Sequence, residues 1–271
     1  MAKSPKSRNP KIKFDKLQMY FGKPYKIDLG TVKISSGLFK EDVKKSITVY
    51  QPTIGKIVDM GEEKFFSSLN AFITNTTSYR LPLWDMGIDW NEISDFDLFL
   101  ILYKSIDNDV SQLLFKLDMS NFEFYTMTLE GVETPVLYSK KDEIIIDENV
   151  YNHFSQYLQE VFQLKPEEKL TDDAVMKKWF VDKDRRQKER DEKKGVDNES
   201  NFQAIISACI NHAGFKYSLR ELENVGVCEF YDSVQRLQLY ESTTALMKGM
   251  YSGFVDGSKI KPDDYNFMKP L

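Results

Sequence analysis

Histidine and cysteine, which most enzymes use as bases, nucleophiles or metal ligands, are scarce: the 271 residues contain two of each. His153 and His212 fall in amphipathic helical patterns in different parts of the chain, which favours surface or core roles over catalysis. The sequence contains no nucleophile elbow and no Cys-x-x-Cys motif. The glycine-rich loops that bind phosphates are also missing. The sequence therefore predicts no enzyme and no cofactor.

The few cysteines and the lack of long apolar runs indicate the compartment. Cys209 and Cys228 lie inside helical patterns and are expected to be small buried apolar residues. A disulfide framework is not needed, so a reducing cytoplasm is the default. No apolar run approaches the ~18 residues of a membrane-spanning helix. Residues 1–8 lack the apolar core of a signal peptide. We therefore expect a cytoplasmic protein.

The net charge of −5 is unevenly distributed. Residues 1–16 carry six Lys or Arg and one Asp, and residues 177–194 carry nine basic and five acidic side chains. The rest of the chain is therefore strongly acidic, which disfavours a broad nucleic-acid-binding face. Residues 1–13 mix Lys, Ser, Pro and Asn without periodicity, and we expect them to form a disordered basic tail.

Short alternating apolar runs predict an antiparallel sheet in an α+β domain over residues 14–163. Two strands are expected at Thr31–Ile34 and Ser46–Tyr50. Alternation over Leu113–Met119 predicts another strand, which leads into an antiparallel β-meander of Phe122–Thr128, Pro135–Tyr138 and Glu143–Ile146. Because sequential strands joined by short turns cannot be parallel, a doubly wound nucleotide-binding sheet is excluded.

Helices complete this predicted domain. The first opens at Gln51, and its buried face is expected to consist of Ile54, Val58, Phe65, Leu69 and Phe72. Gly55 and Gly61 cost this helix about 1 kcal/mol each relative to Ala, which indicates close packing at both points. A second helix begins at the Ser94-x-x-Asp97 capping pattern and is apolar nearly all round, so we expect it to be buried. Asp147 is the predicted cap of a third helix.

The composition changes abruptly over residues 164–200. A helix capped near Thr171–Asp173 begins with an apolar face of Val175, Trp179 and Phe180. From Asp182 to Lys194 it is almost purely charged. A helix that is polar all round is typical of a solvated bridge. We therefore predict a charged helical linker over 164–200, followed by an all-α C-terminal domain and tail over 201–271.

Residues 215–254 have the outline of a helix-turn-helix. A recognition helix needs hydrogen-bond donors near its N-terminus for bases and phosphates. The second helix, from Cys228, instead offers Glu229 and Asp232, which would repel phosphates. This favours a helical hairpin that contacts protein. A DNA-binding regulator that uses residues 218–240 is the alternative.

The same helix carries a long apolar stripe, of which we expect Phe230, Val234 and Leu237 to be core. Exposed aromatic residues concentrate binding energy at protein interfaces. The predicted protein-binding residues are Trp179, Tyr231, Tyr240, Tyr251 and Phe254.

Four carboxylates and two tryptophans gather between residues 83 and 97. Asp85, Asp89, Asp95 and Asp97 do not match the spacing of a calcium loop, and we predict no metal site. Trp84 and Trp90 beside carboxylates are a combination seen in sugar-binding grooves. We favour a loop that both tryptophans pin to the core, and keep a hydrolase or carbohydrate-binding protein as a third hypothesis.

Two groups of segments resemble phage proteins. Gln51–Phe66, together with Leu83–Trp90 and Ile93–Phe99, resembles the layout of proteins from tail modules of phages that infect Gram-positive bacteria. Tyr231–Tyr240 and Gly249–Gly257 resemble the ends of tail assembly chaperones and baseplate hub assembly proteins. The resemblance covers roughly residues 40–105 and 200–260.

The resemblance implies non-enzymatic binding of a tail protein, such as a tape measure or baseplate hub protein, during tail or baseplate assembly. The chain would act as a tail assembly chaperone or a minor structural component. Its expected location is the host cytoplasm, or the virion if it stays in the finished particle.

Overall fold

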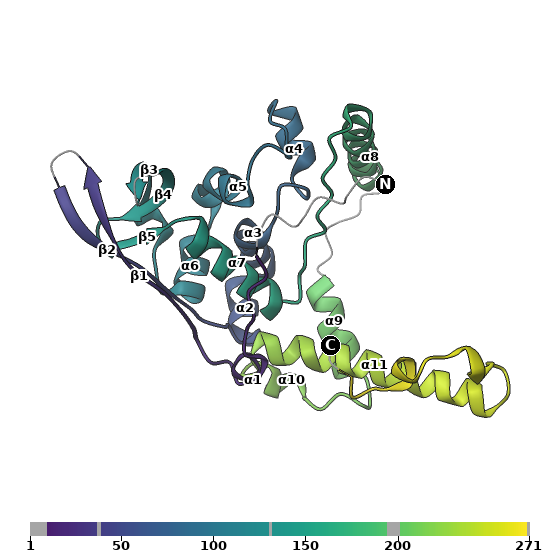
Figure 1. Ribbon diagram of the computed structural model, residues 1–271. Helices are drawn as coiled ribbons and strands as arrows, with labels where there is room; N and C mark the ends of the chain where they lie inside the picture. The colour runs from purple at the N-terminus through teal and green to yellow at the C-terminus, as the bar shows by residue number, and fades with distance from the viewer. Residues whose placement is uncertain (1–9, 37–38, 130–131, 194–200, 270–271) are drawn as a thin grey trace.

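A computed structural model describes residues 10–36, 39–129, 132–193 and 201–269, and the protein has a mixed α+β fold (Figure 1). The predicted class, with a β-meander in the N-terminal half and a helical C-terminal region, is confirmed. Of the predicted tail, residues 1–9 lie outside the described residues. Residues 10–13 run against a helix, because the amide of Ile12 donates to Gln156 Oε1 at 3.0 Å and Gln156 Nε2 donates to the carbonyl of Pro10 at 3.0 Å.

The elements follow the chain in the order of their labels. The strands are β1 Tyr25–Ser36, β2 Phe39–Val49, β3 Phe122–Leu129, β4 Val132–Ser139 and β5 Ile144–Ile146. The helices are α1 Lys16–Tyr20, α2 Ile54–Met60, α3 Glu62–Ile73, α4 Arg80–Asp85, α5 Asp95–Leu102, α6 Asn108–Phe115, α7 Glu148–Val161, α8 Ala174–Lys193, α9 Asn201–Ile210, α10 Leu219–Leu222 and α11 Val227–Tyr251. The 3-10 helices are η1 Tyr103–Ser105, η2 Met119–Asn121, η3 Gly257–Lys259 and η4 Pro262–Tyr265.

The five strands form one sheet in the order β1-β2-β5-β4-β3. The predicted antiparallel meander is confirmed as β3, β4 and β5. The first two predicted strands are parts of a longer antiparallel hairpin, β1–β2, whose far end extends beyond the rest of the sheet (Figure 1). β2 joins the meander through a short parallel contact between Lys44 and Ile144. This is the one parallel pairing among the described strands.

The strand predicted over Leu113–Met119 is wrong, because most of this segment belongs to α6 and η2. Asp107 caps α6, and the helix buries Val110 and Leu114 at the spacing of one helical turn. It ends at Lys116, which takes a left-handed conformation with φ of 59°. The alternating apolar residues therefore belong to the end of a helix and the turn after it. Their spacing also fits the two-residue period of a strand, which is why the sequence suggested one.

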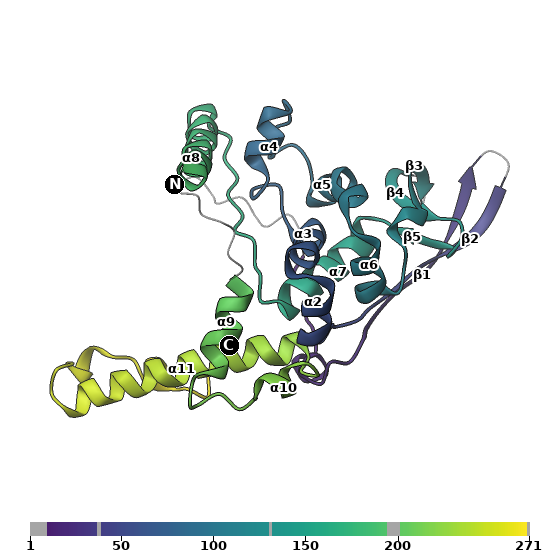
Figure 2. The ribbon, with the colours of Figure 1, turned by 180° about the vertical axis from the view of Figure 1, so that it is seen from behind.

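The core is built around α3 and α7, with α5 and α6 beside them (Figure 2). Asp147 caps α7 as predicted, since its Oδ1 accepts from the amide of Val150 at 3.0 Å. The rings of Phe72, Phe99 and Phe115 each lie within 5.0–6.0 Å of another ring of this cluster. Phe154 lies 5.3–5.9 Å from these three rings. Close-packed aromatic side chains account for most of the buried area here.

Two predictions about buried helix faces are wrong in part. The helix expected from Gln51 is broken at Gly61, whose φ of 91° ends α2 and begins α3. This break resets the helical phase, so Val58 is 57% exposed while Phe65 is fully buried. Ser94 and Asp97 form the predicted capping box of α5. However, α5 is not buried all round, because Ile101 is 46% exposed.

The C-terminal helices dock against α2. Three backbone hydrogen bonds of 3.0–3.2 Å cross this junction, from Ile54 to Val225, from Gly55 to Glu223 and from Val227 to Pro52. Thr53 and Gly226 pair as an isolated antiparallel bridge. Gly55 supplies the close approach predicted for it, because a Cβ added there would lie 2.7 Å from the carbonyl oxygen of Glu223. One hydrophobic core consequently runs from the N-terminal helices into α9 and α11.

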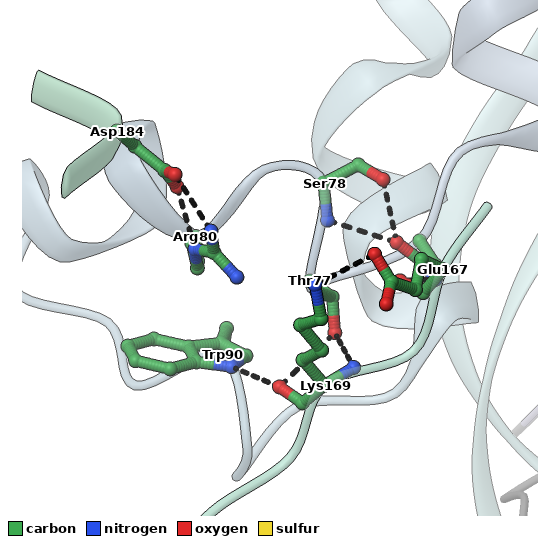
Figure 3. A network of polar contacts seen from close by, with 8 residues as sticks. Thr77, Ser78, Arg80, Trp90, Glu167, Lys169 and Asp184 are labelled. Carbon is green, nitrogen blue, oxygen red and sulfur yellow. Dashed lines mark hydrogen bonds and ion pairs between the residues drawn. The ribbon is translucent and has the colours of Figure 1, made fainter. Parts of the chain in front are cut away.

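Residues 164–173 follow an extended path. Hydrogen bonds between the backbone of this segment and side chains that flank α4 fix it in place (Figure 3). The amide of Lys169 donates to Thr77 Oγ1 at 3.0 Å, and the Lys169 carbonyl accepts from Trp90 Nε1 at 3.3 Å. Asn75 Nδ2 donates to the carbonyl of Glu167 at 3.2 Å. Much of α8 is solvated as predicted, but Val181 is buried beside α4.

Ion pairs also hold α8 to α4 (Figure 3). Arg80 donates two hydrogen bonds to the Asp184 carboxylate, at 2.5 and 2.6 Å, and its guanidinium lies 4.9 Å from the centre of the Phe180 ring. Arg185 pairs with Asp85 in a more exposed position. Bidentate, stacked arginine contacts are stronger than exposed pairs.

We predict that Arg80→Ala lowers the free energy of unfolding by about 1–3 kcal/mol, because it leaves Asp184 without its bidentate partner and uncovers Phe180. Arg185→Ala is the matched control and should cost about 0–1 kcal/mol. Urea denaturation of both variants measures the difference. Equal losses would contradict the described attachment of α8.

We also predict that Gly55→Ala destabilises the fold by about 1–3 kcal/mol, because the new methyl group must displace the backbone at Glu223. Lys56→Ala, at the neighbouring exposed position of α2, should stay within about 0.5 kcal/mol of the wild type. Thermal or urea unfolding distinguishes the two. A Gly55→Ala variant as stable as the wild type would show that this junction is looser than described.

Candidate protein-binding surface

The first half of α11 belongs to the core. Val227, Cys228 and Phe230 are buried, and α1 packs against the same helix. The hydroxyl of Tyr217 donates to Glu229, which ties this turn of the helix to the preceding loop. α10 is a single turn. A helix-turn-helix places a full helix before the recognition helix, so a single turn in that position disfavours this alternative.

The second half of α11 projects away from the core and forms one end of the molecule (Figure 1). Large apolar side chains are exposed along it and just beyond it: Tyr240 is 51% exposed, Tyr251 84% and Phe254 91%. Met247 is also exposed. Such side chains have no role in the protein's own core, so they are available to a partner.

The chain then turns back along α11. Arg236 Nη1 donates to the carbonyls of Phe267 and Lys269, at 3.1 and 2.6 Å, and the rings of Tyr240 and Phe267 meet edge to face at 5.7 Å. Tyr265, Phe267 and Met268 of this returning segment are themselves exposed. We call residues 240–269 the α11 arm: the distal part of the helix and the tail that folds back along it.

The α11 arm gathers three of the five predicted contact residues: Tyr240, Tyr251 and Phe254. Trp179 is exposed but lies on α8, a separate element. Tyr231 is not an exposed contact residue, because its ring packs against Phe230 in the shared core. In the sequence Tyr231 directly follows Phe230 of the buried stripe. Its position around the axis of α11 directs its ring toward the core.

Sequence reasoning missed Phe267 and Met268 as members of this surface. They are apolar residues in an otherwise polar tail, and this contrast was the available signal. The sequence alone did not show that the tail folds back along α11. This path depends on the long-range contacts from Arg236 to the carbonyls of Phe267 and Lys269.

The candidate carbohydrate loop is a structural feature. Trp90 is fully buried and donates from Nε1 to the Lys169 carbonyl, whereas Trp84 is partly exposed and touches Trp90 with ring centres 6.0 Å apart. The loop is therefore pinned by Trp90, and the expectation for Trp84 was wrong.

The nearby carboxylates have protein partners. Asp85 and Asp89 pair with Arg185 and Lys177, and Asp97 completes its capping box. Asp95 accepts a hydrogen bond from the amide of Thr76 at 2.9 Å. Within the part of the chain that the structure describes, no group of three or more His, Cys, Asp or Glu residues could hold a metal ion.

The histidines are apart, as expected, and their surroundings differ. His153 lies on α7 and shares a hydrogen bond of 2.8 Å with the hydroxyl of Tyr25. Partial burial lowers the pKa of His153. His212 was predicted to lie in a helix, but it lies in the turn after α9. Cys209 and Cys228 are buried free thiols, as predicted, and burial raises the pKa of Cys228 to about 11.

The fold is that of an α+β protein whose C-terminal helices share its core and present an apolar arm. Residues 191–270, which include α9, α10, α11 and the described tail, match the family model described as the YomV second domain. That family is phage-derived, and the match supports a phage origin for this chain. No curated protein and no solved structure matches the chain. Among the described helices, none is long and apolar enough to cross a membrane.

The pH dependence of stability can test the inward position of Tyr231. Burial, and to a lesser extent the charge of Glu62, raise the pKa of Tyr231 to about 12, above the ~10 of an exposed tyrosine. The folded state therefore favours the neutral form of Tyr231. Its contribution to the free energy of unfolding is fully present below pH 10 and is lost as the pH rises toward 12, because the tyrosine ionises first in the unfolded state.

We predict that Tyr231→Phe removes this loss, so that wild type and variant diverge by about 1 kcal/mol between pH 9 and pH 11. Urea unfolding at the two pH values measures the divergence. Parallel stability curves for both proteins would place the Tyr231 hydroxyl in solvent.

Proposed function

We propose that this chain is a phage-encoded, non-enzymatic protein that binds another protein through the α11 arm. The observation that carries the proposal is the row of exposed apolar side chains on a projecting element, with Tyr251 and Phe254 the most exposed. Interfaces are enriched in such aromatic and methionine residues. The arm lies within the segment that matches the phage-derived family.

The shape of the molecule supports a docking role. The first half of α11 is anchored by buried residues such as Val227 and Phe230, so the arm is presented by a rigid base. A preorganised contact surface loses less conformational entropy on binding than a flexible one does. The aromatic side chains of the arm also have few rotatable bonds, which lowers the cost further.

We place this binding in tail or baseplate assembly, with a tape measure or baseplate hub protein as partner and the host cytoplasm as the site of assembly. This step rests on the resemblance of Tyr231–Tyr240 and Gly249–Gly257 to the ends of tail assembly chaperones. The chain would act as a chaperone that dissociates, or as a minor component that stays in the virion.

Coexpression of the chain with the tail proteins of its phage, followed by affinity capture, tests the proposal. We predict that the wild type retains a tail protein and that Tyr251→Ser combined with Phe254→Ser reduces retention at least tenfold, which is the loss expected for two contact residues of about 1 kcal/mol each.

The matched control is Val175→Ser on α8, a substitution of another highly exposed apolar residue away from the arm. It should retain the tail protein as the wild type does. Retention by the double variant equal to that of the control would contradict binding through the arm. Failure of the wild type to retain any tail protein would contradict the role in tail assembly.

A further inference from the structure

The exposed side of the distal α11 has the spacing of a coiled-coil seam. Tyr240, Thr244, Met247 and Tyr251 follow one another at intervals of four, three and four residues. All four lie on one continuous helix, and none is fully buried. Alternating steps of three and four residues place side chains along a single stripe that can pack against another helix.

The charged residues beside this seam can form ion pairs with the same residues of a second copy of the chain. Glu241 and Lys248 are both exposed and lie seven residues apart, each next to a seam residue on the same side of the stripe. If two copies of α11 cross antiparallel about a point near Ala245 and Leu246, Glu241 of each copy faces Lys248 of the other. In a parallel pair Glu241 and Lys248 would not meet, because this flank of one helix then faces the opposite flank of its partner. The charge pattern therefore selects a second copy in the antiparallel direction.

The apolar layers define a register that is shifted by two residues, about 3 Å, from direct opposition of Glu241 and Lys248, which these long side chains can span. With the centre of the crossing between Thr244 and Met247, Tyr240 lies opposite Tyr251 of the second copy, and Thr244 lies opposite its Met247. Each layer then combines one residue from either side of the centre, as a two-fold axis requires. The overlap covers twelve residues, a length of about 17 Å.

The rest of the chain leaves most of this stripe open, although Phe267 of the returning tail meets the ring of Tyr240 at the near end. The returning tail covers the neighbouring side of α11, where Thr243 is buried and Met250 packs on Gly257. At the near end, the turn containing Gly214 covers Leu237, so the seam begins at Tyr240. Glu241 has one weak neighbour, His212, at 3.7 Å in an exposed position.

We infer that the α11 arm pairs antiparallel with the arm of a second copy, with Tyr240, Thr244, Met247 and Tyr251 in the seam and two Glu241–Lys248 ion pairs beside it. This inference rests on the proposed function, since it names one partner of the same arm. Phe254 and Met268 lie outside the seam, are 91% and 75% exposed, and stay available to a tail protein.

Charge reversal tests the pairing. Sedimentation velocity over a range of concentrations should show a reversible dimer for the wild type. Glu241→Lys places two lysines opposite two lysines, and Lys248→Glu does the same with glutamates. Each single variant should raise the dimer dissociation constant about tenfold or more, because two attractions become two repulsions.

A double variant and a mixture make the test specific to the antiparallel register. The double variant E241K/K248E restores both ion pairs and should dimerise within about threefold of the wild type. An equimolar mixture of the two single variants should form heterodimers, since every Lys then faces a Glu. Lys178→Glu and Glu189→Lys on α8 are the controls for net charge and should dimerise as the wild type does.

A monomeric wild type at all concentrations would overturn the inference, as would single variants that dimerise like the controls. Loss of dimer in the singles without recovery in the double variant or the mixture would overturn the antiparallel register. Affinity capture of a tail protein by the wild type, measured beside its dimerisation, separates this inference from the proposed function. A wild type that captures a tail protein but does not dimerise refutes only the pairing, whereas one that dimerises without capture refutes only the tail partner.

Discussion

The backbone contact between α2 and the start of α11 is the interaction on which the rest of the structure depends. Gly55 lets the two chains approach until main-chain hydrogen bonds form, and Thr53 pairs with Gly226 as two short strands would. These bonds lie next to the buried Val227, and together with the shared core they fix the C-terminal helices to the N-terminal half. The direction in which the second half of α11 projects follows from this contact, and so does the position of every residue on the arm.

Local signals in the sequence predicted much of the fold. The meander, the caps at Ser94 and Asp147 and the long α11 each rest on residues close together in the chain, where propensity and periodicity act directly. The failures have non-local causes or ambiguous periods. Val58 is exposed because Gly61 resets the helix, and Leu113–Met119 satisfied a strand pattern while forming the end of α6. The docking of α11 on α2 and the return of the tail involve residues far apart in sequence, which a single sequence does not connect.

The candidate surface was predictable to a similar degree. Tyr240, Tyr251 and Phe254 are exposed, as predicted from their spacing and their aromatic character. Tyr231 is instead partly buried, because its ring packs against Phe230, and this packing could not be read from the sequence. The structure unites these residues with the tail as one projecting element whose base is buried and whose tip is apolar. The packed core holds the base of the arm in place, and the exposed surface of the arm is therefore held in a fixed orientation. The segment that matches the family model includes this element.

Native-state hydrogen exchange tests most directly whether the C-terminal helices form one cooperative unit with the N-terminal half. The account predicts that the amides of Gly55 and Val227, which face each other's segment across the junction, exchange only through global unfolding and with the same free energy. Amides of α9 and of the first half of α11 should join them at that level. Exchange of residues 201–251 through a separate opening, at a lower free energy than Gly55, would contradict the account, because the arm would then have no rigid base.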